Sequence, residues 1–170
     1  RQESGQFFTP IPIGRYMMQS LPLSHELKQI IERGDIGHVL PRMIDFASGS
    51  GHFLTEYMSK MQRIIDRLDI SDYGVGLRNK LTDYKGHANG FDKFTWAKDY
   101  VYGVEIDYRL VKTAKINTYL NGDGSANLIR ANGLDDFERS RDFRGLLKGK
   151  PGNGKTDPVF DLVISNPPYS

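Results

Sequence analysis

The sequence predicts an α/β fold built on a parallel sheet, and three observations carry this prediction. Short apolar stretches typical of buried strands recur at 43–47, 100–106, 127–131 and 159–165. Between the first three of these stretches, apolar residues repeat at helical spacing. A glycine-rich turn joins the first strand directly to its helix. Strands that alternate with helices in this manner align in parallel.

Residues 1–38 are expected to form an N-terminal segment with an irregular beginning and two helices. Pro10 keeps the residue before it extended, and a short helix is expected to follow through Tyr16. A second helix is expected to begin with Ser24 as its N-cap and to end near Gly34.

Residues 39–170 are expected to form the core of the domain. The first strand leads into a helix with an apolar stripe over 54–68. Periodicity then fails over about 69–98, which we predict to be an insertion with one short helix at 94–98. After the second strand, Asp107 is the expected N-cap of the next helix.

The composition excludes some chemistry. Among 170 residues there is no cysteine, which rules out disulfides, thiolate metal sites and cysteine nucleophiles. The four histidines lack metal-ligand spacing, so no metal is expected. A net charge of +2 neither requires nor excludes nucleic acid. Because the chain has no apolar span and no signal segment, we expect a cytoplasmic protein that does not contact membranes.

A nucleotide-type site is predicted where the first two strands end. The turn Asp45–Gly51 contains glycines, which let backbone approach a ligand closely, and it opens a helix whose N-terminus favours a negative group. Glu105 ends the second strand, where folds of this class hold a ribose diol. The residues also allow a tight turn without a ligand, and a Glu105 that caps a helix or lies at the surface.

The fourth strand ends in Asn166-Pro167-Pro168-Tyr169. Proline donates no hydrogen bond, so the Pro167 carbonyl stays available as an acceptor, and the Asn166 side-chain oxygen offers a second one. Two neighbouring acceptors suit an exocyclic –NH2 group. Tyr169 offers a flat face on which a base stacks. The alternative is a loop that merely ends an edge strand.

In this order, the motifs resemble those of DNA amino-methyltransferases, in particular the methylation subunits of type I restriction–modification systems. The resemblance covers Gly5–Pro10, Asp45–Gly51 with the following Phe53 and Leu54, Glu105, and Asn166–Tyr169. It implies a Rossmann-like methyltransferase sheet, incomplete on its C-terminal side, in a chain that is part of a longer protein. The implied reaction transfers a methyl group from S-adenosylmethionine to the N6 of adenine in DNA.

The resemblance also implies the roles of residues and the partners. Asn rather than Ser at position 166 favours adenine over cytosine N4. The expected partners are DNA, a specificity subunit and a restriction subunit. The implied catalytic residues are Asn166, Pro167, Pro168 and Tyr169, and the implied cofactor-binding residues are Phe8, Thr9, Asp45, Ala47, Ser48, Gly49, Gly51, Glu105, Ile106 and Asn132.

The chain departs from the family pattern at three positions. Phe46 and Ser48 stand where the family has proline and cysteine, which should leave backbone contacts intact. Asn132 stands where the family has an acid that accepts the adenine amino group of the cofactor. An asparagine oxygen can accept that bond without charge assistance, and Asp135 is a substitute acceptor.

Other functions remain open at this level. An Asn-Pro-Pro-Tyr motif also serves protein-glutamine and ribosomal RNA amino-methyltransferases, and a non-catalytic cofactor-binding subunit would keep the same fold. Covalent C5-cytosine chemistry is excluded, because it needs a cysteine.

The stretch 135–158 is predicted to be a polar loop with a helical turn. Within it, 149–156 fits a phosphate-loop pattern, but it neither follows a buried strand nor opens a helix. Six Lys or Arg residues make 139–155 basic, which is compatible with phosphate contacts and equally with a solvated loop.

Overall fold

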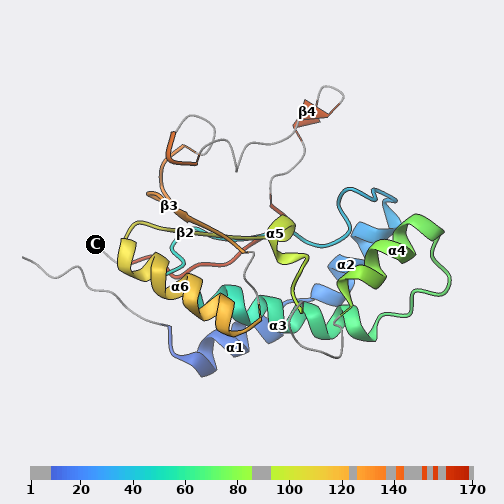
Figure 1. Cartoon of the computed structure of the whole chain (residues 1–170), viewed down its shortest axis with the longest axis horizontal. Coiled ribbons are helices and arrows are strands. Elements are labelled where there is room, and N and C mark those ends of the chain that lie inside the picture. Colours follow the sequence, from blue (N-terminus) through green and yellow to red (C-terminus); the bar gives the residue numbers. More distant parts are fainter. Residues whose placement is uncertain are drawn as a thin grey trace, which may run out of the picture.

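A computed structural model of the chain describes the greater part of the sequence (Figure 1). The described residues are 9–85, 93–122, 126–136, 141–143, 151–152, 155–156 and 160–168.

The predicted parallel sheet is confirmed. Its four strands are β1 (Met43–Asp45), β2 (Val101–Glu105), β3 (Asn127–Arg130) and β6 (Leu162–Val163), in the order β3-β2-β1-β6. Every neighbouring pair is parallel. The arrangement is that of a Rossmann-like α/β fold.

Helices α3 (His52–Arg67) and α6 (Tyr108–Leu120) cover one face of this sheet (Figure 1). Successive strand residues alternate between two apolar clusters, as a strand requires. Met43 packs into the larger cluster beneath α3, whereas Ile44 packs into a smaller cluster on the opposite face with Phe143. As predicted, Asp107 caps α6, with Oδ1 accepting from the Arg109 backbone N–H at 2.7 Å.

The N-terminal helices α1 (Ile11–Ser20) and α2 (Leu23–Glu32) extend this helical layer. Leu23, the first residue of α2, is buried with the stripe that Leu27 continues. The prediction of Ser24 as N-cap was therefore wrong: Pro22 holds the cap position, and Ser24 lies inside the first turn. Burial of Leu23 outweighs the capping preference of serine.

The insertion contains more structure than its sequence predicted. Helix α4 (Val75–Tyr84) was missed, and the short helix α5 occupies Ala97–Tyr100 rather than 94–98. Trp96 Nε1 donates to Gln62 Oε1 at 2.8 Å, and Gln62 Nε2 donates to the Tyr84 carbonyl at 2.9 Å. A buried side chain of α3 thus joins both halves of the insertion to the core.

The last part of the chain has shorter elements than expected. A 3₁₀ turn at Arg141–Phe143 supplies the predicted helical turn, and β4 (Pro151–Gly152) pairs antiparallel with β5 (Lys155–Thr156). Strand β6 spans two residues instead of seven. Its start is held by Asp161, whose Oδ2 accepts from the Arg42 backbone N–H at 2.7 Å.

Candidate functional site

The carboxyl ends of the strands, called here the carboxyl edge, border a hollow of about 390 Å³. From β1 the chain passes through α3 to β2 on one side, whereas β6 lies on the other side of β1. The strand order therefore reverses at β1. In open parallel sheets, ligands bind at such a reversal.

The turn after β1 presents backbone to this hollow. Gly49 and Gly51 have φ values of 51° and 82°, a region that favours glycine. A Cβ on Gly51 would lie 3.1 Å from the Cβ of Ala114, so this glycine also lets α6 approach the turn. Asn117 Nδ2, on α6, donates to the Ser50 carbonyl at 3.0 Å.

Glu105 links the end of β2 to the glycine turn. Its Oε2 accepts from the Gly49 backbone N–H at 2.9 Å, and its Oε1 accepts from the Asp107 backbone N–H at 2.8 Å. A carboxylate has about four lone-pair positions, so two amide bonds orient the group and still leave acceptor capacity for a ligand diol.

The hollow is apolar next to Glu105. Ile106 and Leu134, on two facing loops, are 65% and 83% exposed, and Leu110 completes this end. Large apolar side chains left open beside a carboxylate provide surface that a planar ring would cover.

At the other end of the hollow, Asn166 contacts the N-terminal segment. Its Nδ2 donates to Thr9 Oγ1 at 2.9 Å. Thr9 and Asn166 are separated by 157 residues, yet their motifs meet at the carboxyl edge. Pro167 and Pro168 line the hollow beside them.

Asp45 is buried next to the site and forms hydrogen bonds to two of its segments. It is 1% exposed, and its Oδ1 accepts from Ser165 Oγ at 2.7 Å and from the Ala47 backbone N–H at 3.1 Å. Burial raises the pKa of Asp45 to about 6, against the opposing effect of these hydrogen bonds. Asp45 therefore joins the glycine turn to the residue before Asn166.

Asn132 lines the hollow, and its side-chain amide forms two hydrogen bonds within the loop after β3. Its Oδ1 accepts from the Leu134 backbone N–H at 3.1 Å, and its Nδ2 donates to Asp135 Oδ1 at 3.1 Å. The adjoining Gly133 is required by packing, since a Cβ there would lie 1.9 Å from the carbonyl oxygen of Phe46.

The hollow gathers most of the residues that the sequence singled out. Ser48 does not line it: its buried hydroxyl faces Gly103 and has no hydrogen-bond partner among the described residues. Sequence reasoning missed Leu110 and Leu134, although Leu110 lies one turn beyond the predicted cap. Phe8 and Tyr169 fall outside the described residues. The predicted residues that line the hollow are Ala47, Gly49, Glu105, Ile106, Asn132, Asn166, Pro167 and Pro168.

Comparison with known families gives a match over the whole chain. The family model described as N-6 DNA methylase matches residues 1–170. The chain belongs to the N-6 DNA methylase family. No curated protein matches it. Membership implies a DNA methyltransferase, and the family name points to adenine as the base.

Two further observations concern what this methylase could bind. None of the helices that the structure describes is long and apolar enough to cross a membrane. In the same described regions, no three His, Asp or Glu side chains cluster as a metal site would require.

Proposed function

We propose that this methylase transfers a methyl group from S-adenosylmethionine to the N6 of adenine in DNA. The observation that carries the proposal is the convergence of Glu105 and the Asn166-Pro167 turn on a single hollow. One end of the hollow offers groups that suit an adenosine, and the other offers acceptors that suit an amine.

The residues present fit the cofactor. The oriented Glu105 carboxylate suits a ribose diol, the exposed Ile106 and Leu134 side chains suit the faces of an adenine ring, and the glycine turn at Gly49 gives backbone access. Asp135, whose Oδ1 accepts from Asn132 Nδ2, would add negative charge beside an acceptor for the adenine amino group. When bound, the cofactor supplies an electrophilic methyl group on a sulfonium.

The chain's own residues would orient the target amine. The Asn166 side-chain oxygen and the Pro167 carbonyl accept its two hydrogens, which directs the nitrogen lone pair toward the methyl position. A dedicated base is unnecessary, because the methylated amine loses its proton readily to water. Orientation then supplies most of the rate.

We further propose that the methylase works in a restriction–modification system of the type I kind, with a specificity subunit and a restriction subunit as partners. The support is the set of motifs from Gly5 to Tyr169, whose order resembles that of type I methylation subunits.

The test is transfer of tritiated methyl from S-adenosylmethionine to three acceptors: duplex DNA, ribosomal RNA and a glutamine-bearing release-factor protein. We expect label on DNA, recovered as N6-methyladenine after digestion, and its loss in Asn166→Ala. Label on RNA or protein alone would refute the choice of substrate. Calorimetry that finds no cofactor binding would instead favour a non-catalytic subunit.

A further inference from the structure

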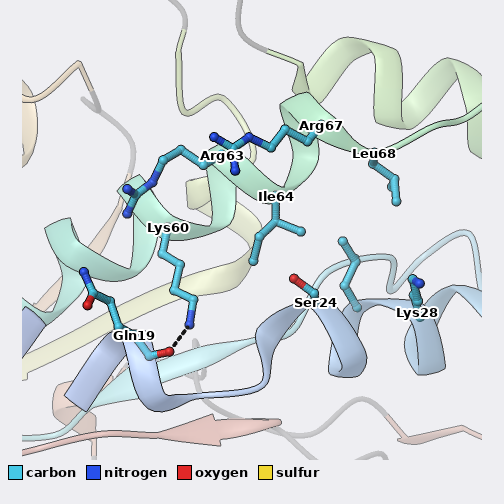
Figure 2. Close-up of a pocket in the computed structure, with 9 residues that line it drawn as sticks. Gln19, Ser24, Lys28, Lys60, Arg63, Ile64, Arg67 and Leu68 are labelled. Carbon is cyan, nitrogen blue, oxygen red and sulfur yellow. Dashed lines mark hydrogen bonds between the residues drawn. The ribbon is translucent and has the colours of Figure 1, made fainter. Parts of the chain in front are cut away.

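A second hollow, of about 440 Å³, lies between α3 and helices α1 and α2 (Figure 2). It borders the last two turns of α3, whose first residue, His52, adjoins the glycine turn. At a rise of about 1.5 Å per residue, Lys60 lies about 12 Å and Arg67 about 22 Å along α3 from His52. This hollow is therefore separate from the carboxyl edge.

Its lining is strongly cationic. We call it the basic groove, because Lys28, Lys60, Arg63 and Arg67 line it and no Asp or Glu does. Figure 2 shows Lys60 reaching from α3 toward the end of α1, while the side chains of Arg63 and Arg67 extend along α3. None of these four side chains forms an ion pair with another described residue.

One of the four cations is held in place. Lys60 Nζ donates to the carbonyls of Met18, Gln19 and Leu21 at 2.8, 3.0 and 2.7 Å, at the end of α1. Arg63 and Arg67 stand one turn apart on α3, where like charges repel. A cluster of this kind is destabilising in the isolated chain and becomes favourable when anionic groups neutralise it.

Apolar side chains also line the groove, among the cationic ones. Ile64 and Leu68 of α3 line it and are only partly buried. A nucleic-acid backbone makes little use of apolar surface, whereas a polypeptide with acidic and apolar side chains matches both features.

We propose that the basic groove docks an acidic segment of a partner polypeptide. Carboxylates of the segment pair with Lys28, Arg63 and Arg67, and its apolar side chains cover Ile64 and Leu68. Because the groove and the hollow beside Asn166 share no lining residue, the docked partner leaves that hollow open. The proposal does not depend on which substrate the methylase modifies.

The test measures binding of the chain to three fluorescent probes: a glutamate–tyrosine copolymer, polyglutamate and a duplex DNA. The groove variant is Arg63→Glu with Arg67→Glu. The matched control is Arg33→Glu with Arg78→Glu, which makes the same charge change at exposed positions outside the groove. Thermal unfolding followed by circular dichroism verifies folding, and Arg63→Gln with Arg67→Gln replaces the groove variant if charge reversal prevents it.

We expect the copolymer to bind more tightly than polyglutamate, and the groove variant to bind it about tenfold more weakly than the control does. Equal binding by the groove variant and the wild type, or no copolymer binding by the wild type, would overturn the proposal. A second result would also overturn it. If the slope of log binding constant for DNA against log salt concentration falls by about 0.9 per replaced arginine, the groove binds DNA. If the chain methylates DNA but does not bind the copolymer, this proposal fails while the proposed function stands.

Discussion

Asn166 Nδ2 donates a hydrogen bond to Thr9 Oγ1 at 2.9 Å, across 157 residues of sequence. The bond holds the plane of the Asn166 amide at the edge of the hollow. Because Thr9 accepts through its oxygen, its own hydroxyl hydrogen remains available to a ligand. The N-terminal segment therefore helps to shape the part of the hollow where we propose that the target amine binds.

Replacing Thr9 with valine should slow methyl transfer by about 10- to 100-fold, because a misoriented Asn166 amide no longer aligns the amine. Thr9→Ser keeps the hydroxyl and should stay within about threefold of the wild type. Single-turnover methylation of duplex DNA measures the rate. If serine and valine impair transfer equally, the hydroxyl is not what positions Asn166.

Glu105→Gln should weaken cofactor binding by about tenfold or more, measured by calorimetry with S-adenosylmethionine. The carboxylate accepts from the backbone N–H groups of Gly49 and Asp107 through separate oxygens. Glutamine has one oxygen, so one amide loses its partner and the charge is lost from the diol site. Asp72→Asn, which changes an exposed carboxylate outside the hollow, serves as control and should bind normally.

The sequence predicted the central elements well, because their periodicity is unambiguous. Strands β1 to β3 and helices α3 and α6 lie where apolar spacing placed them, and Asp107 caps α6. Helix α4 was missed for a physical reason. It begins after Gly74 and contains Gly76, so it depends on burial of Leu81 and Tyr84 more than on local preference.

Side-chain relationships at the site were less predictable. The motif pattern identified Asp45 and Ser48 as cofactor contacts, yet a sequence does not specify which way a side chain turns. Asp45 turns toward Ser165, and the Ser48 hydroxyl turns toward Gly103. The direct roles of these two residues toward a cofactor stay predictions, and their supporting contacts became visible only in three dimensions.

Ser48→Ala should raise the free energy of unfolding by about 1 kcal/mol. The buried Ser48 hydroxyl has no hydrogen-bond partner among the described residues, so it carries an uncompensated desolvation cost. Urea denaturation measures the change, and cofactor affinity should not alter, since the hydroxyl does not line the hollow. A destabilised Ser48→Ala chain would show that the hydroxyl has a partner after all.

Gly133→Ala should weaken cofactor binding strongly. Its Cβ would lie 1.9 Å from the carbonyl oxygen of Phe46, so the loop after β3 must move away and widen the hollow. We expect a loss of affinity of about tenfold or more, with destabilisation of about 1–3 kcal/mol. Gly74→Ala is the matched control, because a Cβ there meets nothing within 4 Å and its φ of −56° suits alanine.

The buried carboxyl of Asp45 should make stability depend on pH in an identifiable window. Burial raises the pKa of Asp45 from 3.8 to about 6 in the folded chain. Between these values the unfolded chain has released the proton and the folded chain has kept it, so rising pH favours unfolding. This group alone should lower the free energy of unfolding by about 2 kcal/mol from pH 4 to pH 6, with a smaller further loss up to about pH 7.

Asp45→Asn removes this titration while its side-chain oxygen can still accept from Ser165. Relative to the wild type, the variant should therefore gain about 2 kcal/mol of stability from pH 4 to pH 6, measured by urea denaturation at intervals from pH 4 to 7.5. The exposed Asp72→Asn variant is the control and should follow the wild-type curve. Parallel curves for Asp45→Asn and the wild type would mean that Asp45 releases its proton in the folded chain as readily as in the unfolded one.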